Sequence, residues 1–183
     1  MGRETMSNYK ISRENAEDEA KGLINSEWAE RGLPIDPTYI AKKVGVKVFE
    51  LDLPSEVDAI LKYYEGGSTP CIFIDPRSAL TRNRFSVAHE LGHFVLNSRL
   101  HPEGGILETD TFYRDEKSRS GDEPLEIFAN QFAAELLMPS KFVRLLVDQN
   151  KTDLVLAADF GVSVEALRNR LNALSIKLQS LTG

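Results

Sequence analysis

The stretch Phe85-Ser-Val-Ala-His-Glu-Leu-Gly-His-Phe-Val-Leu-Asn97 decides how the rest of the chain is interpreted. It contains His89-Glu90-Leu91-Gly92-His93, an H-E-x-x-H pattern, and its apolar spacing predicts a helix. On a helix the two imidazoles lie one turn apart on one face, about 5–6 Å apart at Cβ. Two histidines at that separation can bind one tetrahedral zinc ion, and Glu90 is then placed to take a proton from water at the metal. The simpler interpretation is a buried amphipathic helix, but two of only three histidines in the chain flank this glutamate.

A catalytic zinc site needs a third protein ligand and one open position. The metzincin pattern would place a glycine at position 96 and a histidine at position 99. The chain has Leu96 and Arg99 there, which excludes that class. His101 precedes Pro102 in an apparent turn, and we expect it to be a surface loop residue. The remaining option is a carboxylate on a second helix.

Residues 123–139 have the features of such a helix. Pro124 suits the first helical position and Pro139 ends the helix. One stripe at helical spacing is apolar: Leu125, Phe128, Phe132 and Leu136. A second stripe mixes two polar residues with small ones that let another helix approach closely: Glu126, Ala129, Asn130, Ala133 and Leu137.

The second stripe offers candidates for the metal site. Glu126 fits a third metal ligand, and Asn130 fits a hydrogen-bond partner of a ligand histidine. The alternative is that Glu126 is a solvated glutamate in the first helical turn. Glu135 lies off this stripe, and we expect it to be a surface charge.

The two segments together resemble the ImmA/IrrE metallopeptidases, relatives of the thermolysin-like gluzincins. The matching stretches are Arg82-Asn-Arg-Phe-Ser-Val-Ala-His-Glu-Leu-Gly-His93 and Glu126-Ile-Phe-Ala-Asn-Gln-Phe-Ala-Ala-Glu-Leu-Leu-Met-Pro139, with weaker matches at residues 33–46 and near the C-terminus. By this resemblance the metal ligands are His89, His93 and Glu126, the general base is Glu90, and the metal is Zn²⁺ or alternatively Mn²⁺. Phe128 stands where many relatives have a second glutamate, so no rival carboxylate lies beside Glu126.

The resemblance also implies a fold and a function. The fold is α+β and of small zincin (minimal gluzincin) type, mostly helical with a short three-stranded or larger sheet. The function is a metal-dependent endopeptidase that cleaves a regulatory protein, such as a helix-turn-helix repressor or antitoxin, in a stress, mobile-element or toxin–antitoxin setting. Two alternatives are a DNA-binding transcriptional regulator with a structural metal site and a non-catalytic module that binds a partner protein.

Composition agrees with a small cytoplasmic enzyme. The chain has 183 residues, of which 42% are hydrophobic, enough for one domain and a small appendage. No apolar run approaches the roughly 20 residues of a membrane span, and we expect no membrane partner. The lone Cys71 lies in an apolar segment, which favours a buried thiol in a reducing compartment. The net charge of −6 argues against non-specific nucleic-acid binding by the whole surface.

The pattern before the metal-binding helix predicts two helices and three strands. The helices cover residues 12–31 and 34–45, the second with Asp36 as N-cap before Pro37. The strands cover residues 46–51, 59–64 and 70–74, and a turn at residues 65–68 joins the last two into a hairpin. Residues 100–121 are irregular and form either a mobile loop over the site or a solvated connector. Four side chains are candidate donors to an oxyanion: Tyr63, Tyr64, Tyr113 and Arg114.

The character of the sequence changes after Pro139, which predicts a peptidase domain at residues 1–139 and a helical appendage at residues 140–183. Residues 156–171 resemble a helix-turn-helix, with a glycine in the turn, Ser163 as N-cap, and Arg168 and Arg170 on the second helix. Asp159 and Glu165 dilute the basic face that phosphate contacts require. We therefore favour partner docking or a scaffold role over DNA binding.

Overall fold

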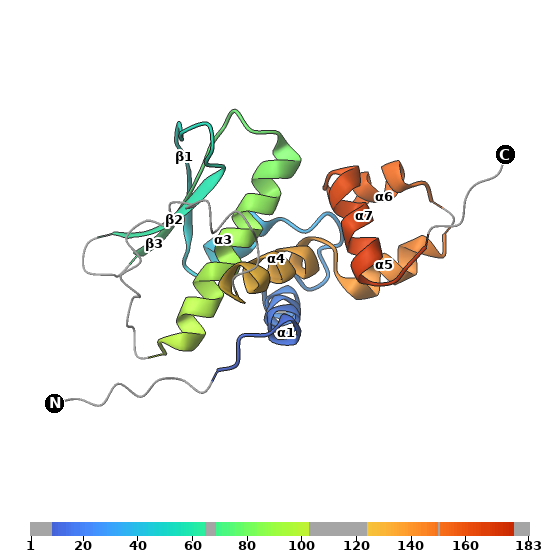
Figure 1. Ribbon diagram of the computed structural model, residues 1–183, viewed down its shortest axis with the longest axis horizontal. Helices are drawn as coiled ribbons and strands as arrows, with labels where there is room; N and C mark the ends of the chain where they lie inside the picture. Colours follow the sequence, from blue (N-terminus) through green and yellow to red (C-terminus); the bar gives the residue numbers. More distant parts are fainter. Residues whose placement is uncertain (1–8, 65–68, 103–123, 150, 178–183) are drawn as a thin grey trace.

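The computed structural model describes residues 9–64, 69–102, 124–149 and 151–177 (Figure 1). Its helices and strands, in chain order, are α1 (Arg13–Leu23), the π-helix η1 (Ile24–Trp28), α2 (Pro37–Lys43), β1 (Lys47–Glu50), β2 (Ala59–Tyr64), β3 (Thr69–Ile74), α3 (Leu80–Leu100), α4 (Pro124–Leu137), α5 (Ser140–Val147), α6 (Asp153–Phe160) and α7 (Val164–Ala173). The fold is α+β, mainly helical with one small sheet, as the sequence predicts.

The sheet has three strands in the order β1-β3-β2. β2 and β3 form the predicted antiparallel hairpin, in which Ala59 pairs with Ile74. β1 lies on the other side of β3 and runs parallel to it, so β3 is central and β1 and β2 are the edges. Cys71 lies in β3 and is buried, as expected of a structural thiol.

The helices before the sheet begin where the sequence indicates. The Ser12 side chain accepts a hydrogen bond from the Asn15 amide at the start of α1. Asp36 does the same for the Thr38 amide at the start of α2. The predicted helix over residues 12–31 is α-helical to Leu23 and continues as the π-turn of η1.

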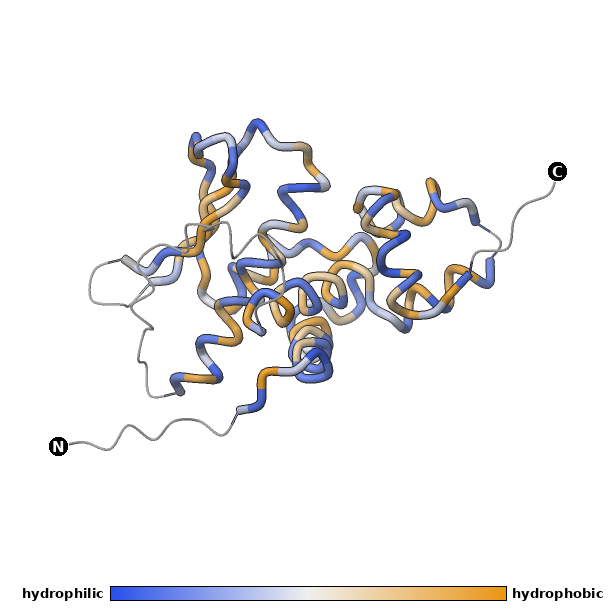
Figure 2. Tube along the Cα trace, in the orientation of Figure 1, coloured by the Kyte–Doolittle hydropathy of each residue, from blue (hydrophilic) through white to orange (hydrophobic). Residues whose placement is uncertain are grey.

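α3 and α4 cross at the centre of the molecule, with the sheet on one side of α3 and α1 packed against α4 (Figure 1). The predicted apolar stripe of α4 is largely buried, since Phe128, Phe132 and Leu136 have no exposed surface. Figure 2 shows hydrophobic and hydrophilic residues alternating along the helices. Within the described residues, no helix combines the length and the apolar character needed to cross a membrane.

The C-terminal helices α5, α6 and α7 lie beyond the end of α4 (Figure 1), and α6 and α7 form the predicted helix-turn-helix-like unit. Gly161 ends α6 in the left-handed region at a φ of 65°, and the Ser163 side chain accepts from the Ala166 amide to begin α7. Arg84 of α3 donates to the carbonyls of Gly161 and Ile35 at 2.8 and 2.6 Å. The division after residue 139 remains a prediction, and one buried apolar cluster includes residues on both sides of it.

The expectation that Glu135 is a surface charge is wrong. Glu135 is 1% exposed and forms an ion pair with Arg170, which is 2% exposed, because α7 lies against the end of α4. The Ser140 amide and hydroxyl also donate to its carboxylate. Burial raises the pKa of Glu135 above its usual value, and the neighbouring Arg170 opposes that rise. This buried pair connects the C-terminal unit to the helix that carries Glu126.

Candidate metal centre

α3 presents the two histidines of the H-E-x-x-H motif on one face. His89 and His93 are one turn apart, and their ring centroids lie 4.7 Å from each other. Their Nε2 atoms are 3.0 Å apart, so both rings turn the same kind of nitrogen toward one point. Both side chains are at least nine-tenths buried. Burial therefore holds two nitrogen donors close together on α3.

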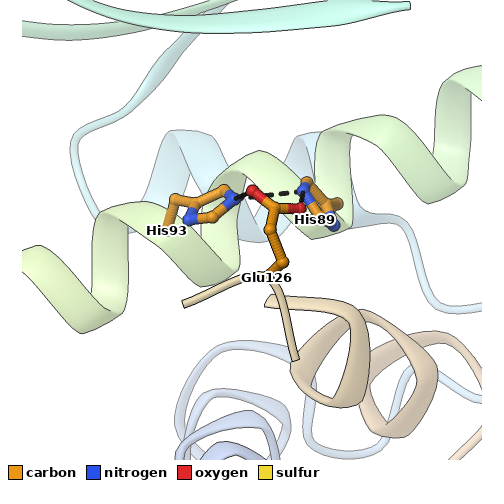
Figure 3. Close-up of side chains that lie close together, drawn as sticks. All are labelled: His89, His93 and Glu126. Carbon is orange, nitrogen blue, oxygen red and sulfur yellow. Dashed lines mark hydrogen bonds and ion pairs between the residues drawn. The ribbon is translucent and has the colours of Figure 1, made fainter. Parts of the chain in front are cut away.

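α4 brings the predicted carboxylate to the same point. Glu126 Oε2 lies 3.3 Å from His89 Nε2, and Glu126 Oε1 lies 3.2 Å from His93 Nε2 (Figure 3). The potential ligand atoms of these three residues all lie within 4.8 Å of one another. The alternative of a solvated first-turn glutamate does not describe Glu126, whose side chain is 12% exposed.

The donor set fits a tetrahedral metal ion. Zinc bonds of about 2.0–2.1 Å to nitrogen and oxygen place neighbouring ligands of a tetrahedron about 3.3 Å apart. Here the two Nε2 atoms lie 3.0 Å apart, and each lies 3.2–3.3 Å from a different oxygen of the Glu126 carboxylate. Burial alone would raise the pKa of Glu126, but hydrogen bonds from His89 and His93 outweigh it and hold the pKa well below its usual range. Glu126 is therefore a carboxylate, the form that coordinates a cation.

Asn130 lies one turn after Glu126 on α4 and holds the first histidine. Its Oδ1 is 3.0 Å from His89 Nδ1. Because an amide oxygen only accepts, His89 Nδ1 donates to it, and Nε2 is the ring nitrogen that a metal ion would take. The predicted partner of a ligand histidine is thus in contact with His89.

Gly92, inside the motif, explains how the two helices come close enough to share a site. A Cβ at Gly92 would lie 3.0 Å from the Ala129 Cα and 3.3 Å from the Ala129 carbonyl oxygen. The small residues in the second stripe of α4 therefore pack directly against Gly92 of α3. This close packing of the two backbones places Glu126 beside the histidines.

The model of peptidase family M78, the IrrE N-terminal-like domain, matches residues 41–172, which include every residue of this centre. The chain belongs to this family. It therefore contains a metallopeptidase-like domain. A search of curated proteins finds no match.

Among solved structures, a Mycobacterium tuberculosis transcriptional regulator has a similar fold, with a TM-score of 0.59 and 21% sequence identity. The match covers 91% of this chain and 48% of the regulator, so the chain spans about half the length of that protein. At this identity the similarity concerns the fold alone.

Glu90 follows His89 on α3. It is not one of the three residues, His89, His93 and Glu126, whose ligand atoms converge in the described part of the chain. Its side chain is half-buried, whereas His89 is buried. A carboxylate beside the ligands, and not among them, is the arrangement that the family motif requires of a general base.

The structure describes only some of the other candidate residues, which are the possible oxyanion donors and His101. The Tyr63 hydroxyl accepts a hydrogen bond of 3.2 Å from Asn97, one turn beyond His93, and burial raises the pKa of Tyr63. Sequence reasoning proposed Tyr63 but missed Asn97, although its spacing from the two histidines places all three on one helical face. His101 caps the end of α3 and is not in the ligand group. Tyr113, Arg114, the Tyr64 side chain and most of the 100–121 segment lie outside the described residues.

Proposed function

We propose that this chain is a metal-dependent endopeptidase. His89, His93 and Glu126 would bind one metal ion, and Glu90 would be the general base. The observation that carries the proposal is the convergence of three ligand atoms, from two packed helices, within 4.8 Å. Membership of a peptidase family supports hydrolysis of a peptide bond as the reaction.

Two nitrogen donors and one carboxylate favour Zn²⁺, and Mn²⁺ is the alternative because it also accepts carboxylate ligands. A bound zinc ion would polarise the scissile carbonyl and lower the pKa of a water molecule toward 7.

The protein's own residues then perform the proton transfers. Asn130 keeps the His89 ring in one orientation through the 3.0 Å hydrogen bond to Nδ1. Glu90 takes a proton from the water as its oxygen attacks the carbonyl carbon, and then gives that proton to the leaving amine when the carbon–nitrogen bond breaks. The half-buried position of Glu90 suits this role, because a free carboxylate must reach both water and substrate.

For the substrate we propose a regulatory protein, such as a helix-turn-helix repressor or antitoxin, cleaved to relieve repression under stress or in a mobile-element or toxin–antitoxin setting. The similar solved structure is named a transcriptional regulator, which supports a regulatory setting. The lone, buried Cys71 supports activity in the reducing cytoplasm, where such a repressor acts.

Direct DNA binding through α7, the second helix of the helix-turn-helix-like unit, has little support from its charges. Arg170 is buried against Glu135, and Arg168 forms an ion pair with Asp153. Neither arginine is left unpaired to contact phosphate, which is the main source of affinity for DNA.

The test is cleavage of the repressor encoded beside the gene by the metal-loaded chain. Wild type and Glu14→Gln, which makes the same change at an exposed position of α1, are expected to cleave at one site and to stop when a chelator is added. Glu90→Gln is expected to bind the metal without cleaving. Equal cleavage by Glu90→Gln would contradict the proposed base, and stoichiometric binding without cleavage by wild type would favour a sequestering module.

A further inference from the structure

A groove of about 590 Å³ separates the start of α3 and the second half of α4 from α7. Its volume is in the range of about 300–1,000 Å³ that is common for ligand sites. The groove joins the helices of the metal centre to the second helix of the helix-turn-helix-like unit.

The groove begins beside the metal centre. Asn130, which bonds the His89 ring, lines it. Phe85 also lines it, and the Phe85 ring centroid is 6.2 Å from that of His89. A chain that entered the groove would therefore lie behind the His89 ring, on the side away from the Nε2 atom that faces Glu126 and His93.

One face of α7 forms the opposite wall. Glu165, Ala166, Asn169 and Ala173 line the groove, at the spacing of a single helical face. In a DNA-binding helix-turn-helix the second helix presents its side chains to the major groove. Here this face is turned toward the peptidase helices.

Of the four charged residues that line the groove, three are in ion pairs and Glu165 is left. Arg82 forms an ion pair with Asp58 at 2.5 Å, and Arg170 forms one with Glu135. Glu165 lines the same groove, is exposed, and has no ion-pair partner among the described residues. A basic side chain is the complement of this site, whereas phosphate is repelled by it.

The uncharged lining suits a polypeptide. Side-chain amides of Asn130, Gln131 and Asn169 can donate to and accept from peptide groups. Met138 and Val162 add apolar surface between them.

We infer that this groove binds a segment of the substrate polypeptide that lies away from the scissile bond and carries a lysine or arginine, with Glu165 as the specificity-determining residue. The inference rests on the proposed peptidase function for its biological meaning, but the binding itself is separately measurable. It assigns the helix-turn-helix-like unit to peptide recognition.

The experiment uses photo-cross-linking in the full chain. Cys71 is buried and is the only cysteine, so Asn169→Cys provides a selective attachment point for a benzophenone maleimide. Asn172→Cys is the matched control, because Asn172 is an exposed asparagine of the same helix that does not line the groove. Each labelled protein is irradiated with a library of random decapeptides, and the captured peptides are identified by mass spectrometry.

The label at position 169 is expected to capture peptides enriched in lysine and arginine by about two- to five-fold, the size expected of one exposed ion pair. Adding Glu165→Gln should abolish the enrichment, and Glu165→Lys should reverse it toward acidic peptides. The label at position 172 should show no enrichment. Equal capture at both positions, enrichment that survives Glu165→Gln, or displacement of the peptides by random-sequence duplex DNA would overturn the inference.

The experiments can refute the proposed peptide-binding groove and the proposed peptidase reaction independently of each other. Selective capture by a chain that never cleaves would keep the groove and refute the proposed reaction. Cleavage by a chain that captures peptides equally at both positions would keep the reaction and refute the groove.

Discussion

Replacement of Gly92 by alanine tests whether the backbones of α3 and α4 touch at the metal centre. The new Cβ would lie 3.0 Å from the Ala129 Cα and 3.1 Å from Phe132 Cδ1. Because the first of these atoms is backbone, α4 itself has to move. Overpacking of this kind costs about 1–3 kcal/mol, and the higher helix propensity of alanine offsets about 1 kcal/mol of that.

Gly22→Ala is the matched control. Gly22 is also helical, in α1, and a Cβ there would have no atom within 4 Å. Its propensity gain of about 1 kcal/mol is therefore unopposed. The propensity terms cancel between the two variants, so their free energies of unfolding should differ by the steric cost alone, about 1–3 kcal/mol.

Urea unfolding of the metal-free variants, followed by circular dichroism, measures this difference. A zinc titration adds a second readout, because α4 carries Glu126 one turn from Ala129 and its displacement separates the third ligand from the histidines. Gly92→Ala should bind zinc more weakly than wild type, and Gly22→Ala should bind it equally well. Equal stabilisation by both alanines, with zinc affinity unchanged, would refute the close approach of the two helices.

Three further predictions concern a contact of the metal centre, the buried ion pair of α7 and the turn after β3. Asn130→Ala removes the hydrogen bond to a ligand histidine and should weaken zinc binding about 10- to 100-fold in a competition assay with a chelating dye. Arg170→Met leaves the buried Glu135 carboxylate without its cation and should cost about 3–5 kcal/mol in chemical denaturation, while the double variant with Glu135→Leu should recover most of that loss. Hydrogen bonds from the Arg77 side chain and amide lower the pKa of Asp75 to about 2, so the stability it contributes is complete above about pH 4 and is lost as the pH falls toward 2. Asp75→Asn should therefore lower the melting temperature at pH 7 and have little effect near pH 2; an equal effect at both values would contradict the assignment.

The ligand set could be predicted from sequence because each part of it is local. The H-E-x-x-H spacing fixes two histidines on one helical face, and the stripe of α4 places Glu126 and Asn130 together one turn apart. The alanines of that stripe also indicated a close helix partner. That the partner is Gly92 could not be predicted, because the contact joins positions on two helices whose packing no local pattern specifies.

The main feature that the sequence did not predict is the burial of a charged side chain, Glu135. Glu135 lies off both predicted stripes of α4, which indicates solvent when the helix is considered alone. It is buried because Arg170, 35 residues later, supplies a guanidinium from α7. Similarly, the pairing of β2 with β3 could be predicted because the two strands are close in sequence. The parallel pairing of β1 with β3 depends on tertiary packing, which no local pattern specifies.

The most direct test of the metal centre is a calorimetric titration of the metal-free chain with Zn²⁺. His89, His93 and Glu126 converge on one point, so wild type should bind one ion per chain. Glu90→Gln should bind it equally well, because Glu90 is outside the ligand group, and Glu126→Gln should bind it at least about 10-fold more weakly. Equal zinc affinity in wild type and Glu126→Gln would contradict the account.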